Sequence, residues 1–198
     1  MKFTTKLDSD YRRLNKIKKL GTLGKKGFIS VISTQHRDTL NVISNICYIK
    51  IHDYSKQENN SIMKEQNLNL GLGNKIIPEL DKAFDTKNYA ATKEVTRKQV
   101  KAMLADLKEL KSKAQNSSYV CTGMYKVSYK ENDMTKVINF DIKFFTAVLK
   151  LLDRIMLDNK LDSLEFYFMA TEGKTNLKPM LIQVGSAMQL VAAPVRPL

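Results

Sequence analysis

Apolar positions along this chain follow two different periods, and the change from one to the other predicts its elements. Segments in which apolar residues recur every three or four positions predict helices at residues 9–20, 97–113 and 141–156. Asp8 or Ser9 is suited to cap the first helix and Thr96 the second, and Gly21 is a typical helix stop. Each helix follows a short predicted strand, so we expect three strand–helix–strand units.

Strands are predicted where β-branched and aromatic residues form short runs. These runs lie at residues 3–7, 28–33, 39–44 and 47–52 before a polar stretch at 55–74, and at 89–94, 119–130, 136–140, 163–170, 179–184 and 188–193 after it. The last two runs are joined at Gly185-Ser186. Because Pro194 has no N–H to donate, it should end the pairing of the last strand. The mixture of helices and short strands predicts an α+β fold.

The net charge narrows the choice of partner. Lys and Arg number 33 against 20 Asp and Glu, which gives a net charge of +13. A surface this basic favours an anionic partner, either nucleic acid or a membrane face. No apolar run is long enough to span a bilayer, and the N-terminal residues lack the pattern of a secretory signal. Cys47 and Cys121 are isolated, as in proteins of a reducing cytoplasm, so we expect a cytoplasmic protein without a membrane partner.

The basic residues are organised along the predicted helices. Residues four and seven apart share a helix face. In the second predicted helix, the apolar face consists of Val100, Met103, Leu104, Leu107 and Leu110. Beside the apolar side of each helix lies a basic stripe, made of Arg12, Lys16 and Lys19 in the first helix, Arg97, Lys101, Lys108 and Lys111 in the second, and Lys143, Lys150 and Arg154 in the third. One such stripe is ordinarily a solvated surface. Three of them favour a continuous basic face that contacts phosphates without reading bases.

Candidate catalytic and metal-binding residues are few. His36 and His52 have no ligand-spaced neighbours, and we expect no metal, no cofactor and no catalytic site. A small metal-dependent enzyme acting on nucleic acid stays an alternative, and it would use Asp81, Asp85 or Asp141. The two nearby acids Asp81 and Asp85 are more typical of a turn or a cap than of a catalytic pair.

The C-terminal part of the chain resembles the DNA sliding clamps, the family of the bacterial β clamp and of proliferating-cell nuclear antigen. The resemblance covers residues 76–196 and rests on the order of four pieces: "VINFDIKFFTAVLKLLD", "LDSLEFYF", "LKPMLIQV" and "MQLVAAPVR". The segments "IIPELDKAF" and "VTRKQVKAMLADLKEL" are similar to the crossing between clamp domains and the helix after it. The resemblance implies a clamp-like N-terminal domain at 1–75 and a C-terminal clamp domain at 76–198. Because a clamp domain takes two strand–helix–strand units, the N-terminal domain is either reduced in size or contains a further helix within residues 55–74.

The resemblance also implies a function. Sliding clamps are rings with helices on one face of antiparallel sheets; the helices line the hole through which duplex DNA passes. We therefore expect a homo-oligomeric processivity factor that encircles DNA in a bacterial or phage-infected cytoplasm and binds a DNA polymerase and a clamp loader through peptide motifs. The positions that match the family's peptide pocket are Pro78, Val191, Ala193, Pro194, Val195 and Arg196. A second hypothesis is a regulator or scaffold for replication or transcription proteins that has the clamp fold but does not encircle DNA.

Overall fold

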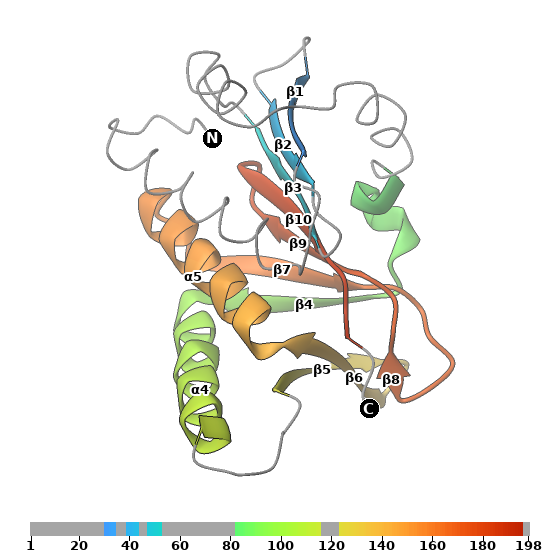
Figure 1. The fold of residues 1–198 in the computed structure, drawn as a ribbon. Helices are drawn as coiled ribbons and strands as arrows, with labels where there is room; N and C mark the ends of the chain where they lie inside the picture. The colour runs from blue at the N-terminus through green and yellow to red at the C-terminus, as the bar shows by residue number, and fades with distance from the viewer. Residues whose placement is uncertain (1–29, 35–38, 44–46, 53–81, 116–122, 196–198) are drawn as a thin grey trace.

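The computed structural model describes residues 30–34, 39–43, 47–52, 82–115 and 123–195. Two helices lie side by side, and strands fill the other side of the molecule (Figure 1). The helices are α4 (Arg97–Gln115) and α5 (Ile142–Asp158). The described part of the chain is thus an α+β structure, as the sequence predicts.

The larger sheet has seven strands in the order β1-β2-β3-β10-β9-β7-β4, and all neighbours are antiparallel. Its strands are β1 (Ser30–Thr34), β2 (Thr39–Ile43), β3 (Cys47–Ile51), β4 (Ala91–Thr96), β7 (Ser163–Phe168), β9 (Met180–Val184) and β10 (Met188–Ala192). The expected boundary at residues 75–76 lies outside the described residues. Because β3 pairs with β10, the segments before and after this boundary share one sheet.

The smaller sheet holds β5 (Met124–Glu131), β6 (Met134–Asp141) and the two-residue β8 (Thr175–Asn176). Strands β5 and β6 form a hairpin through Asn132 and Asp133, whose φ angles of 48° and 63° suit a tight two-residue turn. Strand β8 pairs with β6 in parallel, so this sheet is not wholly antiparallel. The sequence pattern did not predict β8.

A buried ion pair holds the chain that leads to β8. The Nζ of Lys136 lies 3.2 Å from Glu131 Oε2, and both side chains are almost fully buried. Lys136 also donates to the carbonyl oxygen of Thr171, while the Thr171 N–H donates to Glu131 Oε1 at 3.4 Å. Because a buried charge needs a partner, this pair fixes the connection after β7 against the β5–β6 hairpin.

Two strand–helix–strand units exchange their strands. In the unit β4-α4-β5 and in the unit β6-α5-β7, the first strand pairs with the last strand of the other unit. The junctions match: the Arg97 N–H donates to Asp162 O, and the Ile142 N–H donates to Gly123 O, both at 2.8 Å. The two units are therefore related by an approximate two-fold arrangement, and neither can complete its strand pairs alone.

Local hydrogen bonds start each helix at its junction. In α4 the Gln99 N–H donates to Thr96 Oγ1 at 3.3 Å, and the Thr96 N–H donates to Gln99 Oε1 at 2.7 Å. This reciprocal pair is a capping box and confirms Thr96 as the cap of the predicted helix. In α5 the carboxylate of Asp141 accepts from the Phe144 N–H at 2.8 Å.

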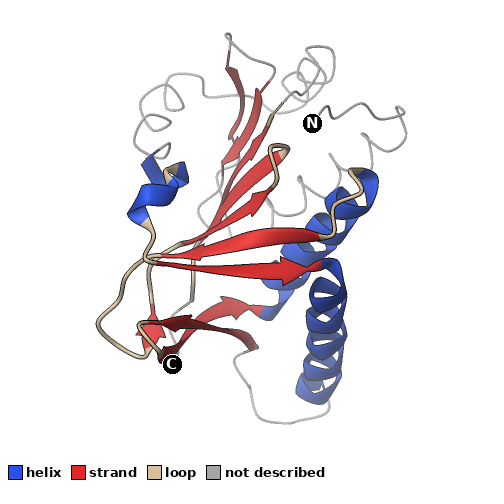
Figure 2. Cartoon of the chain, turned by 180° about the vertical axis from the view of Figure 1, so that it is seen from behind, coloured by secondary structure: helices blue, strands red, loops and turns tan. Residues whose placement is uncertain are grey.

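The main core lies between the two helices and the two sheets (Figures 1 and 2). Alternation along the strands selects what enters it: Leu190 and Ala192 of β10 belong to this core, whereas Val191 belongs to a second cluster. Helix α5 buries nine of its 17 residues, and all nine are apolar. Leu110, which the sequence pattern placed on the apolar side of the second helix, does not belong to the core. Its side chain is 39% exposed because it lies near the end of α4, beside Glu109 and Tyr125.

The cap of α5 yields a stability prediction. Replacing Asp141 by Ala removes the acceptor for the Phe144 N–H, and we expect the free energy of unfolding to fall by about 1 kcal/mol. Asp141→Asn keeps an acceptor oxygen and should be destabilised much less, as measured by urea denaturation. Equal destabilisation of the two variants would show that the side-chain acceptor does not stabilise the helix start.

Candidate nucleic-acid interface

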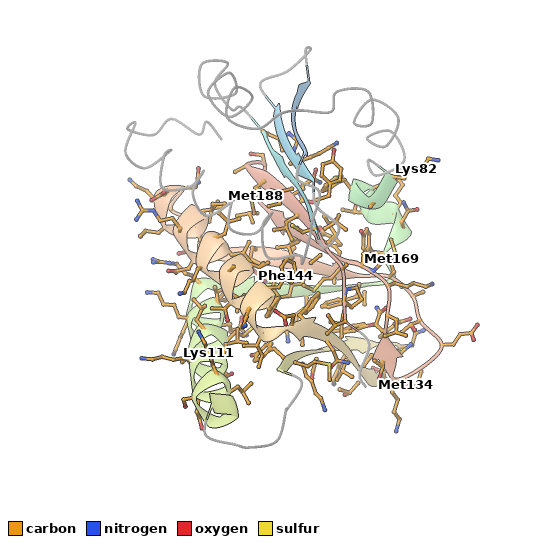
Figure 3. The ribbon with its side chains drawn as sticks, in the orientation of Figure 1. Lys82, Lys111, Met134, Phe144, Met169 and Met188 are labelled. Carbon is orange, nitrogen blue, oxygen red and sulfur yellow. The ribbon has the colours of Figure 1, made fainter. Side chains whose placement is uncertain are left out.

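Five lysines of the predicted basic stripes are exposed on the two helices. They are Lys101, Lys108 and Lys111 on α4 and Lys143 and Lys150 on α5. None of the five forms a hydrogen bond or an ion pair with a residue that the structure describes. Figure 3 shows nitrogen-tipped side chains projecting from both helices away from the strands, with Lys111 labelled on α4. These ammonium groups are available to a phosphate backbone.

The two arginines of the stripes hold carboxylates. The Nε of Arg97 on α4 donates to Asp153 Oδ1 on α5 at 2.8 Å, so this bond joins the two helices. The Nε of Arg154 donates to Asp158 Oδ2 at 3.0 Å, four residues further along the same helix. The sequence pattern placed both arginines on the basic face but did not reveal these partners.

Three predicted contacts lie outside the described ranges, and one exposed lysine was not predicted. Arg12, Lys16 and Lys19 of the first predicted helix lie outside the described residues. Lys98 is exposed on α4 beside Arg97, although it belongs to no stripe. Its position in the first turn of a predicted helix was the signal available in the sequence.

The far flank of α4 carries an acid instead of lysines. Asp106 Oδ2 accepts from the Tyr125 hydroxyl at 3.4 Å, and the two residues line a hollow between α4 and the start of β5. Burial, followed by the charge and the hydrogen bond of Asp106, raises the pKa of Tyr125 to about 12. Three of the five exposed lysines and this acidic site thus belong to the same helix, α4.

The predicted peptide-binding positions lie near the end of β10. Val191 is buried in a cluster with Tyr48, Leu181 and Phe84. Phe84 belongs to η1 (Lys82–Phe84), the first of two short 3-10 turns, and its ring meets that of Tyr48 edge to face at 4.7 Å between centroids. The second turn is η2 (Thr86–Asn88). Val191 is therefore packed in a cluster that includes Phe84 of the same chain.

The residues after β10 turn toward the smaller sheet. Ala193, Pro194 and Val195 are half-buried, and the strand ends before Pro194. The Val195 N–H donates to Asn139 O of β6 at 2.8 Å, so the backbone of this predicted pocket residue is attached to the smaller sheet. Pro78 and Arg196 lie outside the described residues.

The acids of the alternative metal-dependent enzyme have structural partners where they are described. Asp141 caps α5, and Asp85 accepts from the Lys87 N–H at the start of η2. Asp81 lies outside the described residues. Within the described ranges, no three His, Cys, Asp or Glu side chains come together as metal ligands would.

Among the helices of the described chain, none is both long and apolar enough to cross a bilayer. Comparison with known proteins gives no relative: no family model, no curated protein and no solved structure matches this chain.

The environment of Tyr125 predicts an alkaline effect. Because folding raises its pKa from 10.0 to about 12, the folded state disfavours the phenolate, and this contribution to stability is present below pH 10 and disappears as the pH rises toward 12. Ultraviolet titration of wild type against Tyr125→Phe isolates this group. In Asp106→Asn the midpoint should fall but stay above 10, because burial is the largest cause. A midpoint near 10 in wild type would contradict the described environment.

Proposed function

We propose that this protein is a sliding-clamp-like processivity factor that binds duplex DNA through the helix layer formed by α4 and α5. The observation that carries the proposal is the set of five exposed lysines on two adjacent helices, which have no partner among the described residues. Lysine ammonium groups bind phosphates as point charges and need no particular base sequence. A protein that moves along DNA requires interactions of this kind.

The arrangement of the strands supports the same proposal. A clamp domain contains two strand–helix–strand units, and the described residues contain two such units that exchange strands. Both helices lie together on one side, as in a domain whose helices face a central hole. This support concerns geometry alone and comes from no relative.

Ring formation is the second part of the proposal. Among the described strands, β1 and β4 are the two edges of the seven-stranded sheet. Strand β4 lies beside β5, whose Ser128 carbonyl oxygen accepts from Lys93 Nζ at 2.8 Å, so β1 is the edge that a neighbouring subunit could reach. An unpaired edge exposes backbone N–H and C=O groups, which a neighbouring subunit could satisfy in a closed ring. The polymerase and the clamp loader would then dock on the outside, near the end of β10.

Charge reversal tests the helix layer. Changing Lys101, Lys143 and Lys150 together to Glu should weaken binding to duplex DNA and reduce the slope of log affinity against log salt by about 0.9 for each phosphate that is no longer neutralised. The matched control changes the exposed Lys87, Lys130 and Lys178 to Glu, which alters the net charge equally away from the two helices. If both triple variants bind equally weakly, only total charge matters and the helix layer is not the interface.

The topology of DNA tests encirclement. After loading, a ring should remain on closed circular DNA and be released when the circle is cut, because it slides off the free ends. The measurement is co-elution of protein with circular or linearised DNA during gel filtration in moderate salt, together with the mass of the free protein. A monomer retained equally on both forms would favour the regulator or scaffold that does not encircle DNA.

A further inference from the structure

The bond between Arg97 and Asp153 leaves most of the guanidinium free. It uses Nε of Arg97 at 2.8 Å from Asp153 Oδ1, and each side chain is 28% exposed. The terminal nitrogens of Arg97 make no hydrogen bond or ion pair with any residue in the described part of the chain. Arg97 is thus both held by a carboxylate and open to a further partner.

The geometry of arginine gives this arrangement a chemical meaning. The guanidinium is a planar fork, and its two terminal groups can donate to two oxygens of one phosphate. A carboxylate that holds Nε restrains the plane of the fork before a ligand arrives. The side chain then gives up less freedom on binding than a flexible lysine does.

The position of the pair connects it with the exposed lysines. Arg97 begins α4 in the same stripe as Lys101 and Lys108, and Asp153 lies on α5 next to the turn that carries Lys150. The pair therefore bridges the two helices that carry the proposed DNA-binding face. Arg154 differs because its partner Asp158 lies on the same helix, is only 11% exposed and has a further interaction.

We propose that Asp153 is a positioning residue for DNA binding: it holds Arg97 through Nε so that the terminal groups of the guanidinium take one backbone phosphate. This inference rests on the proposed function. It adds one interaction of fixed geometry to a surface otherwise made of flexible lysines.

The test compares duplex binding by wild type, Arg97→Gln, Asp153→Ala, Asp153→Asn and the double variant Arg97→Gln/Asp153→Ala. Affinity is measured between about 50 and 200 mM salt, a range over which one neutralised phosphate changes affinity about threefold. Arg97→Gln should reduce the salt slope by about 0.9, because one cation is lost. Asp153→Ala should weaken binding at every salt concentration without that loss of slope, because Arg97 keeps its charge but must be ordered on binding. The double variant should bind no more weakly than Arg97→Gln, and Asp153→Asn should keep the wild-type affinity, since its amide oxygen can still accept from Nε.

The control is Asp106→Ala, which removes the same charge from the opposite flank of α4 and should leave the affinity and the slope unchanged. Thermal unfolding of each variant shows whether the fold is kept. A steeper slope and tighter binding in Asp153→Ala would overturn the inference, because the carboxylate would then compete with DNA for Arg97. An unchanged slope in Arg97→Gln would overturn it as well. If wild type shows no salt-dependent DNA binding, the proposed function itself is refuted. Failure of the proposed function is thereby distinguished from failure of the inference about Asp153.

Discussion

The exchange of strands between two strand–helix–strand units is the constraint on which the described fold depends. The last residue before α4, Thr96, pairs with Ser163, the first residue of the strand after α5. In the same way the last residue before α5, Asp141, pairs with Met124, the first residue of the strand after α4. Backbone hydrogen bonds of Arg97 and Ile142 close both junctions. Because each unit supplies the pairing partner of the other, the two helices are brought together on one side, and the arrangement of their charged faces follows from this pairing.

Much of this architecture could be predicted from periodicity, and the rest depends on interactions between residues distant in the sequence. The limits of α4 and α5 were clear because their apolar stripes are strong and Thr96 is a good cap. The pairing of β8 could not be predicted, since it relies on the buried Lys136–Glu131 pair and on a loop 35 residues away. The basic stripes were also visible, but Asp153 is 56 residues from Arg97, beyond the reach of any helical pattern. The exposure of Leu110 likewise depends on where α4 leaves the sheets.

The two helices contribute differently to the candidate interface. Helix α5 is buried over most of its circumference, so its few charged residues stand on a support that packing holds rigid. Helix α4 is more exposed and carries more of the lysines, with Asp106 on its far flank. The interface thus combines charged residues on a tightly packed helix with lysines on a more exposed helix, whose side chains can change conformation. That combination agrees with the proposed binding of DNA at no fixed sequence position.

The attachment of Val195 to Asn139 has a mechanical consequence. The chain leaves the larger sheet at Ala192 and is fastened to the smaller sheet three residues later. Tension applied at Val195 is therefore shared between β10 and β6, and β6 leads directly into α5. The hydrogen bond between Val195 and Asn139 has to break before such tension acts on the hairpin of β9 and β10 alone.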